Sequence, residues 1–567
     1  MVNTDKTICR MIASMLAGYG VKDVVISPGS RNTPLVMAIC RNPVLRTRQI
    51  VDERTAAFIA LGMASGCNRP VALVCTSGSA VLNFAPAVAE AYYRKTPLIV
   101  ISADRPRAWI DQDDSQTIRQ HGVLGGITQA SCAVDDVTED VGFQNRVLND
   151  VLATALHGRR GPVHINVHLS APLSDVTESG DNNDFSRVIE YIEAPQVIST
   201  AQSRRFAEYL HGRKILVVGG FMPPDARLNK ALGELAALPQ VAVVVEALAN
   251  VHAAGAYNSP SAILSGLTPM ERSDLAPDVV LSFGGALVNT QLKEFLRGAA
   301  GSETWCIGRN ETTVDCFRTL SRRVEIEPAG FFPRLAGAMA FLNRKNGSTC
   351  GYSEKWRKAA ASAMASSADF MSATPWSDLA VVSHILQRIP HNANLQLGNG
   401  MSVRNALLHD LGAFHRVDSN RGVSGIDGCV GTAVGAASMY NGLTYAIVGD
   451  MSATYDMGAL AYAAMAPGLR LIVVNNGGGG IFHFVGTTRN LPEKDMMVNS
   501  PAPPLRQLAE AYGLRYFSAG DFGSLAAAMN SMAHRSPTPA VLEVFTDGES
   551  SAGIMRSYLS RNNLTNE

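Results

Sequence analysis

Two polar residues at the ends of predicted strands form the most informative pattern in this sequence. Asp450 follows the apolar run "YAIVG", and Asn476 follows the run "LRLIVVN", 26 positions further on. An aspartate and an asparagine at the carboxyl ends of parallel strands supply hard oxygen ligands, which suit a magnesium ion that also takes phosphate oxygens. The glycine run after Asn476 lets the backbone approach a diphosphate closely. The segment therefore predicts a site for a metal ion and a diphosphate cofactor.

Four arginines also follow predicted strands, where the ligand cleft of an α/β sheet lies. They are Arg31, Arg105, Arg404 and Arg421, each close to glycine, serine or asparagine. Because guanidinium binds carboxylate in bidentate fashion, they indicate acidic substrates. Each also has an ordinary interpretation as a surface arginine, and the residues alone leave both open.

The elements that must position these residues are strands and helices in alternation. Short β-branched runs alternate with helical patterns along most of the chain, which predicts parallel sheets. Three sets of such runs are separated by the polar segments 173–187, a predicted linker, and 343–356. We therefore expect three doubly wound parallel-sheet α/β domains, at residues 1–180, 190–345 and 360–567. Near the N-terminus, helical spacing of Ile8, Met11, Ile12, Met15 and Leu16 predicts a helix and not a signal peptide.

The composition fits a globular enzyme with large cores. The chain has 567 residues, of which 46% are hydrophobic and 17% charged, with no net charge. The absence of a basic tract argues against nucleic acid as a partner, and no run of about 20 apolar residues predicts a membrane span. Nine scattered cysteines without a Cys-x-x-Cys pair favour reduced thiols in a cytoplasmic protein.

Several further segments occur in one order across the whole chain. They are "ISPGSRNTPL", "DERTAAFIALGMA", "TSGSAVLNFAPAVAEAYY", "ISADRP", "SQTIRQHGVLG", "SNRGVSGIDG" and "VVNNGGGGIF". With them the chain resembles the 2-succinyl-5-enolpyruvyl-6-hydroxy-3-cyclohexene-1-carboxylate synthases (the MenD family), which belong to the thiamine diphosphate (ThDP) enzyme superfamily. The metal-binding segment is typical of ThDP enzymes in general, and the arginine-bearing segments select this family.

The resemblance implies an activity, cofactors and an assembly. The cofactors are ThDP and Mg²⁺ or Mn²⁺, and the substrates are 2-oxoglutarate and isochorismate. The first substrate is decarboxylated, and the resulting succinyl carbanion undergoes conjugate addition to the second in menaquinone biosynthesis. The active unit is a homodimer or homotetramer, because in this superfamily the two domains that share one cofactor come from different subunits.

The resemblance also implies which residues bind the cofactor. Glu53 opens an apolar-faced helix, where a carboxylate commonly interacts with the helix dipole. In this family it would instead share a proton with the aminopyrimidine of ThDP, and an apolar pocket favours the protonated form of such an acid. Ile426 would hold ThDP in a V shape that brings its reacting atoms together. The implied cofactor contacts are Glu53, Ile426, Gly449, Asp450, Ser452, Asn476, Gly478 and Ile481, and the implied metal ligands are Asp450, Asn476 and Gly478.

The implied substrate contacts come from both ends of the chain. Those for isochorismate are Ser30, Arg31, Arg105 and Gln116. Arg404 and Arg421 would contact the acidic substrates, with Arg421 on the succinyl carboxylate. Phe482 and Val485 would extend an apolar wall from Ile481, which favours decarboxylation because charge disperses in that step. The residues implied to act in catalysis are Glu53, Arg31, Gln116, Arg404 and Arg421.

The sequence departs from the family pattern at a few positions. Thr290 and Gln291 stand where the family usually has a basic pair in the middle domain, and nearby Lys293 offers a substitute. Gly400 stands where serine is common. Neither change touches the predicted metal ligands.

Two alternatives to the synthase interpretation stay open. A 2-oxoacid decarboxylase or an acetolactate-synthase-like enzyme with another acceptor would share the metal-binding segment and would not need all four arginines. A non-catalytic paralogue that binds acidic metabolites is supported only by the departures from the family pattern.

Overall fold

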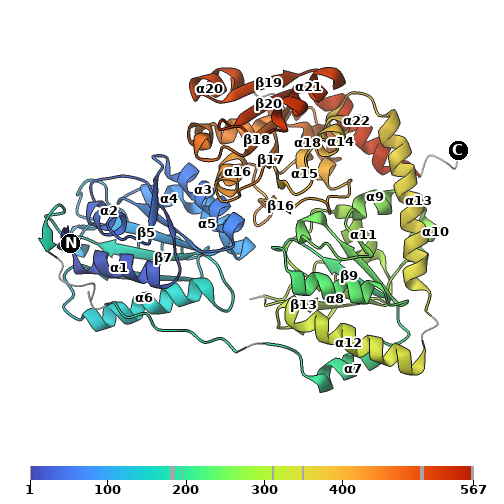
Figure 1. The fold of residues 1–567 in the computed structure, drawn as a ribbon, viewed down its shortest axis with the longest axis horizontal. Coiled ribbons are helices and arrows are strands. Elements are labelled where there is room, and N and C mark those ends of the chain that lie inside the picture. The colour runs from blue at the N-terminus through green and yellow to red at the C-terminus, as the bar shows by residue number, and fades with distance from the viewer. Residues whose placement is uncertain are drawn as a thin grey trace.

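The computed structural model describes residues 2–178, 186–194, 196–309, 312–347, 350–498 and 504–562. Within these ranges three sheets of six parallel strands form three doubly wound α/β domains, which confirms the predicted fold class. A small antiparallel sheet pairs β1 (Val2–Thr4) with β8 (Val176–Glu178). The C-terminal domain lies above the N-terminal and middle domains in Figure 1. Of the helices that the structure describes, none has the length and apolar character needed to cross a bilayer.

The N-terminal sheet has central strands that are buried on both faces, as parallel strands covered by helices must be. In spatial order its strands are β3 (Arg46–Gln49), β2 (Asp23–Ile26), β4 (Val71–Cys75), β5 (Leu98–Asp104), β7 (Val163–His168) and β6 (Ala130–Asp135). Its helices are α1 (Thr7–Gly18), α2 (Thr33–Cys40), α3 (Glu53–Cys67), α4 (Ala80–Asn83), α5 (Ala85–Arg94), the 3-10 helix η1 (Arg107–Trp109) and α6 (Val141–Leu156). The apolar period predicted near the N-terminus forms the buried face of α1.

The segment predicted as a linker after this domain contains a β-strand. Residues 173–187 include β8, whose backbone pairs with β1 at the start of the chain. Residues 179–185 of the same segment lie outside the described residues.

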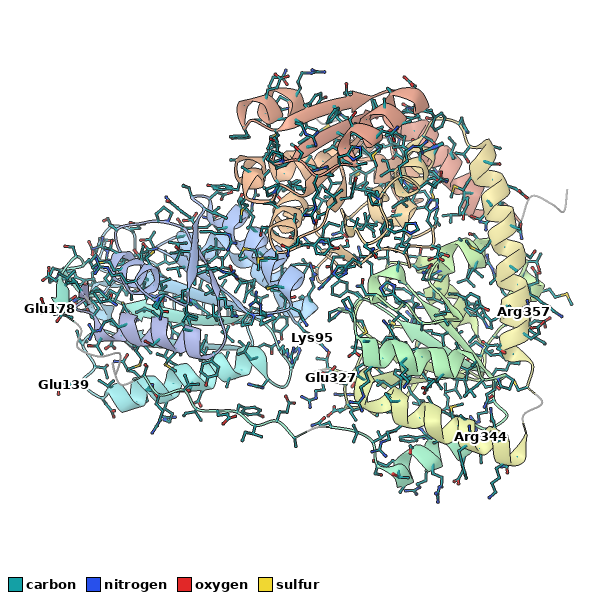
Figure 2. The ribbon with its side chains drawn as sticks, viewed as in Figure 1. Lys95, Glu139, Glu178, Glu327, Arg344 and Arg357 are labelled. Carbon is teal, nitrogen blue, oxygen red and sulfur yellow. The ribbon has the colours of Figure 1, made fainter. Side chains whose placement is uncertain are left out.

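The middle sheet is likewise all parallel. In spatial order its strands are β11 (Ala256–Tyr257), β10 (Val241–Val245), β9 (Ile215–Gly219), β12 (Val279–Phe283), β13 (Glu303–Ile307) and β14 (Leu320–Val324). Its helices are α7 (Thr200–Leu210), α8 (Ala226–Ala236), the 3-10 helix η2 (Ala247–Ala249), α9 (Pro260–Ser265), α10 (Pro269–Asp274), α11 (Thr290–Gly298) and α12 (Pro328–Asn346). Figure 2 shows Lys95 of the N-terminal domain facing Glu327 of this domain, and their opposite charges attract.

The C-terminal sheet carries the segment with the predicted metal ligands. In spatial order its strands are β16 (Arg416–Ser419), β15 (Asn394–Leu397), β17 (Thr444–Gly449), β18 (Leu469–Asn475), β20 (Ala540–Phe545) and β19 (Arg515–Ala519). Its helices are α13 (Tyr352–Ala373), α14 (Asp378–Leu386), α15 (Met401–Ala406), α16 (Cys429–Ser438), α17 (Asp450–Tyr455), the 3-10 helix η3 (Met457–Met465), α18 (Gly480–Phe484), α19 (Lys494–Val498), α20 (Leu505–Ala511), α21 (Phe522–Met532) and α22 (Gly548–Leu559). The connection between β17 and β18 is a short α-helix, α17, followed by the 3-10 helix η3.

The strand orders relate the two terminal domains to each other. When the strands of each sheet are numbered from one in chain order, both terminal sheets have the spatial order 2-1-3-4-6-5, whereas the middle sheet has the order 3-2-1-4-5-6. Ligands of such sheets bind beyond the carboxyl ends of the strands where the order reverses. In the C-terminal sheet that point lies between β15 and β17, so the residues after these two strands are placed for binding.

Helices α3 and α16 join the N-terminal and C-terminal domains by crossing at close range. A Cβ atom on Gly62 of α3 would lie 2.0 Å from the carbonyl oxygen of Thr432, and one on Gly435 of α16 would lie 2.0 Å from that of Ile59. Only glycine permits this approach of the two backbones. The middle domain contacts the C-terminal domain through Asn250. Its side chain exchanges hydrogen bonds of 2.8 and 3.0 Å with the backbone of Val417 in β16, the edge strand of the C-terminal sheet.

Candidate active site

Asp450 stands at the start of α17 with its carboxylate directed at the glycine loop after β18. One carboxylate oxygen accepts a hydrogen bond of 2.8 Å from the Met451 amide, and the other accepts one of 2.7 Å from the Gly478 amide. Burial raises the pKa of Asp450, and hydrogen bonds from these backbone amides oppose that shift. Gly477, Gly478 and Gly479 all have positive φ, at 86°, 93° and 59°. Such a run turns successive amides toward one side, which is a geometry that binds anions.

Asn476 presents a carbonyl oxygen that has no partner among the described residues. Its amide nitrogen donates a hydrogen bond of 2.8 Å to Asp378 Oδ2, which fixes the orientation of the amide group. Its Oδ1 atom is buried and unpaired. The Asp378 carboxylate is held in turn by the hydroxyls of Thr546 and Ser551, at 2.6 and 3.3 Å.

These residues fit a divalent metal that bridges to a diphosphate. A buried unpaired carbonyl oxygen is costly unless something binds it, and Mg²⁺ and Mn²⁺ prefer carboxylate and carbonyl oxygens. Across the described ranges, no group of three or more histidine, cysteine, aspartate or glutamate side chains forms another metal site. The candidate donors here would instead be one carboxylate, one amide and one backbone carbonyl, the set that the resemblance implies.

Glu53 begins α3 without serving as its cap. The capping residue is Asp52, which accepts hydrogen bonds from the Arg54 and Thr55 amides at 3.2 and 3.3 Å. Within the described residues the Glu53 side chain makes no hydrogen bond or ion pair, and the residue is half-buried. The C-terminal domain anchors this helix start, because Tyr462 Oη accepts from the Val51 amide at 3.0 Å and the Tyr455 carbonyl accepts from Arg54 at 2.7 Å. The carboxylate of Glu53 is thus free to act on a ligand.

Arg31 and Arg105, the first arginine pair, lie together beyond β2 and β5. Burial, followed by repulsion from Arg105, lowers the pKa of Arg31. Arg105 is tied to Asp114 at 2.9 Å, and its carbonyl contacts His168 Nδ1 at 2.7 Å. Both arginines are half-buried, and the carboxylates of Asp114, Asp104 and Asp136 partly compensate the charge of Arg31.

Gln116 and Ser30 extend the surface around the first arginine pair. Gln116 has a φ of 59°, and its side chain packs against Gly78 at the end of β4, where a Cβ would lie 2.9 Å from Gln116 Cγ. Ser30 is exposed beside Arg31, and its carbonyl accepts from the Thr33 hydroxyl at 2.8 Å.

Arg404 and Arg421, the second arginine pair, lie together beyond β15 and β16. Burial, followed by repulsion from Arg421, lowers the pKa of Arg404. Arg404 donates to the Gly400 carbonyl at 2.6 Å, and Arg421 donates to Asn399 Oδ1 at 2.9 Å. The Gly400 backbone has a φ of 88°, a left-handed conformation that favours glycine over the serine common in the family.

The middle domain brings Glu246 and Lys293 to the second arginine pair. Glu246 is buried and accepts hydrogen bonds from the Val288 and Asn289 amides at 2.9 and 2.6 Å. Burial raises its pKa, and the nearby charges of Arg421 and Lys293 oppose the shift. Thr290 is exposed, whereas Gln291 is half-buried and its side-chain oxygen is unpaired within the described residues. Lys293 is therefore the cation that α11 offers toward Arg421.

The remaining predicted residues surround the glycine loop. Ser452 is buried on α17, and Gly449 directly precedes Asp450. Ile426 is half-buried in the loop before α16. The predicted apolar wall is formed by partly exposed side chains on or next to α18: Ile481, Phe482 and Val485.

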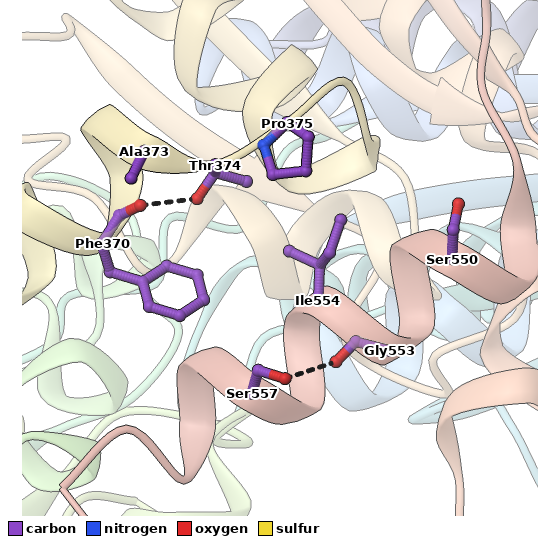
Figure 3. A pocket seen from close by; sticks show the side chains of 8 residues that line it. All are labelled: Phe370, Ala373, Thr374, Pro375, Ser550, Gly553, Ile554 and Ser557. Carbon is purple, nitrogen blue, oxygen red and sulfur yellow. Dashed lines mark hydrogen bonds between the residues drawn. The ribbon is translucent and has the colours of Figure 1, made fainter. Parts of the chain in front are cut away.

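Within one chain, the predicted site residues of the N-terminal domain are not in direct contact with those of the C-terminal domain. Among the described residues, no hydrogen bond or ion pair links Glu53 or the first arginine pair to Asp450, Asn476 or the second arginine pair. A cavity of about 420 Å³ between α13 and α22 also lies apart from them, because its lining includes none of the predicted residues (Figure 3). Its walls are Phe370, Ala373, Thr374, Pro375, Ser550, Gly553, Ile554 and Ser557.

Comparisons with known proteins agree with this geometry. Residues 6–123 match the thiamine pyrophosphate enzyme N-terminal TPP binding domain, and residues 410–544 match the C-terminal TPP binding domain of the same enzymes. A 2-succinyl-5-enolpyruvyl-6-hydroxy-3-cyclohexene-1-carboxylate synthase from Porphyromonas gingivalis is 36% identical over 98% of this chain and 97% of its own length. The chain belongs to this synthase family. Synthases of the same name from Flavobacterium johnsoniae and Desulfotalea psychrophila are 33% and 34% identical, covering 98% and 89% of this chain and 99% and 92% of their own. The chain is accordingly a ThDP-dependent enzyme.

Several residues of this site are not evident from the sequence. Asp378 orients Asn476 from a helix that begins 98 positions earlier, and "PWSDLAVV" indicates only a helix start. Glu90 lies inside a segment that carries the family resemblance and Asn399 follows β15, yet neither has a spacing that indicates a contact. His168 and Asp104 contact the backbone of Arg105 from the ends of the neighbouring strands β7 and β5. This contact can be foreseen only when the order of the strands in the sheet is known.

Proposed function

We propose that this chain catalyses ThDP-dependent decarboxylation of 2-oxoglutarate and conjugate addition of the succinyl unit to isochorismate. The product would be 2-succinyl-5-enolpyruvyl-6-hydroxy-3-cyclohexene-1-carboxylate, in menaquinone biosynthesis in the cytoplasm. The observation that carries the proposal is the unpaired Asn476 oxygen beside Asp450, in a chain that matches synthases of this name over nearly its full length. The paired arginines supply the positive charge that two acidic substrates require.

The cofactor-binding residues have separate tasks. Asp450, Asn476 and the Gly478 carbonyl would hold Mg²⁺ or Mn²⁺, and the amides of the glycine loop would bind diphosphate oxygens. When bound, ThDP supplies the nucleophilic carbon and the electron sink for decarboxylation. Glu53 would hold and release a proton at the aminopyrimidine, and Ile426 would support the bent shape of the cofactor.

The substrate-binding residues neutralise and orient carboxylates. Arg421 would bind the distal carboxylate of 2-oxoglutarate, with Arg404 beside it and Lys293 adding charge from the middle domain. Ser30, Arg31, Arg105 and Gln116 would bind isochorismate. Ile481, Phe482 and Val485 would exclude water from the reacting atoms, which strengthens these charge interactions.

We infer that a second copy of the chain completes each site, in a homodimer or homotetramer. Glu53 and the metal-binding residues are not in contact within one chain, and apolar side chains beside the predicted residues are exposed. Val51, next to the Glu53 helix, is 63% exposed, and Val423, beside Arg421, is 46% exposed. A partner surface would cover them.

Mixing two inactive variants tests this arrangement. In a mixed dimer of Glu53→Gln and Asp450→Ala chains, one site would combine the intact Glu53 with the intact Asp450. We expect activity to return on mixing and subunit exchange, up to about a quarter of the wild-type level for random pairing, in which half of the dimers carry one intact site. No recovery in verified mixed dimers would show that each chain forms its own site.

A panel of 2-oxoacids tests the substrate proposal. With ThDP and Mg²⁺, carbon dioxide release should be fastest from 2-oxoglutarate and slow from pyruvate. A preference for pyruvate would support the acetolactate-synthase-like alternative. ThDP binding without turnover of any 2-oxoacid would support the non-catalytic one.

A further inference from the structure

The loop that carries Arg421 has a backbone that needs outside support. This loop, residues 420–425, joins β16 to α16 and leads directly into Ile426. Ser424 has a φ of 64°, in the left-handed region that a residue with a side chain rarely adopts. Such a conformation persists where surrounding contacts hold it.

Glu90 of α5, in the N-terminal domain, accepts hydrogen bonds from this loop. Its carboxylate is buried, with a residue exposure of 1%, and accepts hydrogen bonds of 2.7 Å from both the Gly422 and Val423 amides. A Cβ atom on Gly422 would lie 2.5 Å from the Glu90 carbonyl oxygen, so the loop can approach α5 this closely only with glycine there. The nearest cation is Arg94 at 4.0 Å, and the two amides are therefore the main partners of the carboxylate.

Asn399 holds the same loop from the opposite side. Its amide nitrogen donates to the carbonyls of Asn420 and Gly425, both at 2.6 Å, and its oxygen accepts from Arg421 at 2.9 Å. Asn399 thus fixes both ends of the loop, while Glu90 fixes its middle. Arg94, one turn beyond Glu90, adds a hydrogen bond of 3.1 Å to the Asn420 side chain.

We propose that Glu90 is a positioning residue that sets the place of Arg421, and with it the preference for a 2-oxoacid with a second carboxylate. The proposal rests on the proposed function, in which Arg421 binds the succinyl carboxylate. Glu90 touches no substrate in this account. It acts because a charge-assisted pair of hydrogen bonds fixes the two residues after Arg421, and bidentate carboxylate binding by arginine depends on orientation.

Glu90→Gln tests the proposal with little change in volume. Glutamine replaces one acceptor oxygen with an NH₂ group that must face a backbone N–H, so one hydrogen bond is lost. We expect the KM for 2-oxoglutarate to rise about tenfold, the size of effect that an unsatisfied buried donor produces. Carbon dioxide release from 2-oxobutanoate, which lacks the second carboxylate, and ThDP affinity should both stay unchanged. Gly422→Ala, which pushes the loop from Glu90 by an independent route, should raise the same KM.

Two further variants separate positioning from general destabilisation. Asp23→Asn removes another buried carboxylate, paired with Arg46 and Arg48 at 2.6 and 2.7 Å, and should lower the melting temperature without changing the KM. In an Arg421→Ala background, Glu90→Gln should have no further effect on kcat/KM.

The role of Glu90 and the proposed function would be contradicted by different results. An unchanged KM for 2-oxoglutarate in folded Glu90→Gln and Gly422→Ala proteins, or additive effects of Glu90→Gln and Arg421→Ala, would overturn the role of Glu90. If the wild-type protein released no carbon dioxide from 2-oxoglutarate, the proposed function itself would fail.

Discussion

The side-chain nitrogen of Asn476 donates a hydrogen bond of 2.8 Å to Asp378, and the oxygen of the same amide is buried without a protein partner among the described residues. The orientation of Asn476 is thereby fixed before any metal binds. A ligand held in this way needs no rearrangement on metal binding, which is the usual task of residues behind metal ligands.

Removing the negative charge of Asp378, which accepts the hydrogen bond from Asn476, should weaken metal binding. Asp378→Asn places an amide where Asn476 needs a carboxylate, and we expect the Mg²⁺ affinity to fall by about 10–100-fold. Calorimetric titration of ThDP over a series of Mg²⁺ concentrations measures this. The matched control is Glu543→Gln, which alters the equivalent 2.7 Å bond to the neighbouring Asn475 and should leave Mg²⁺ affinity intact. Equal Mg²⁺ affinities in Asp378→Asn and wild type would refute the role of Asp378.

A variant of Glu53 should lose turnover, whereas a variant of its neighbour Asp52 should lose stability. Glu53→Gln removes the proposed proton carrier and should reduce turnover at least 10²–10⁴-fold, while the free energy of unfolding changes by less than about 0.5 kcal/mol because no contact is lost. Asp52→Ala removes the helix cap and should cost about 1 kcal/mol with turnover retained. Steady-state rates and urea unfolding measure both effects. Near-normal turnover in Glu53→Gln would remove Glu53 from the mechanism.

Lys293 should matter for the acidic substrates although the family's basic pair is absent. Lys293→Gln removes the charge near Arg421 and keeps the length of the side chain, and we expect the KM for 2-oxoglutarate to rise about tenfold. Arg297→Gln, on an exposed position of the same helix, removes an equal charge and should change the KM little. If both variants raise the KM equally, only the net charge of α11 matters.

The crossing of α3 and α16 should not tolerate a single added methyl group. Gly62→Ala places a carbon 2.0 Å from a backbone oxygen, and such overpacking should lower the free energy of unfolding by about 1–3 kcal/mol or more. Gly337→Ala, in α12, meets no atom within 4 Å and should raise it by about 0.5–1 kcal/mol through helix propensity. Urea unfolding compares the two, and equal effects would show that the crossing is more adaptable than its geometry indicates.

Asp456 should give the protein a pH-dependent stability. Burial raises its pKa to about 7 from an ordinary 3.8, and the charges near it are Arg54, Asp427 and Asp52. Between these pKa values the folded state holds a proton that the unfolded chain releases. The resulting contribution of Asp456 to the free energy of unfolding is therefore fully present below about pH 4 and is lost as the pH rises through 7. The upper bound of the change is about 4 kcal/mol.

Comparison with Asp456→Asn isolates this effect from that of other groups. His164 and His409, whose pKa values burial lowers to about 4, act in the opposite direction and are common to both proteins. Between pH 4 and 7 the urea midpoint of the wild type should fall relative to that of Asp456→Asn, and above pH 7 the difference should level off. Parallel curves would show that Asp456 is ionised when buried.

The sequence predicted the central strands and one edge strand, β16, and missed the other edge strands. Runs such as "VALVC" are buried on both faces and therefore continuously apolar. Edge strands have one exposed side and little apolar pattern, so "RTRQ" in β3 and "RYFSA" in β19 gave no strand signal. The predicted domain boundaries stay predictions.

The predicted metal ligands and arginines follow strand ends, whereas two of the residues that hold them, Glu90 and Asp378, lie elsewhere. Asp450 and Asn476 were evident because hard ligands at two adjacent strand ends are an unusual pattern. Glu90 and Asp378 stand on helices, in positions where a buried carboxylate has no sequence pattern of its own. Their roles depend on which loop packs against the helix, and only the tertiary structure determines that.

The most direct test of the central claim follows isochorismate by its absorbance in a mixture of purified protein, ThDP, Mg²⁺ and 2-oxoglutarate, with carbon dioxide release measured in parallel. We expect isochorismate to disappear only when ThDP and 2-oxoglutarate are both present, with one carbon dioxide released for each molecule consumed. Carbon dioxide release that leaves isochorismate untouched, or no reaction while ThDP is bound, would contradict the proposed function.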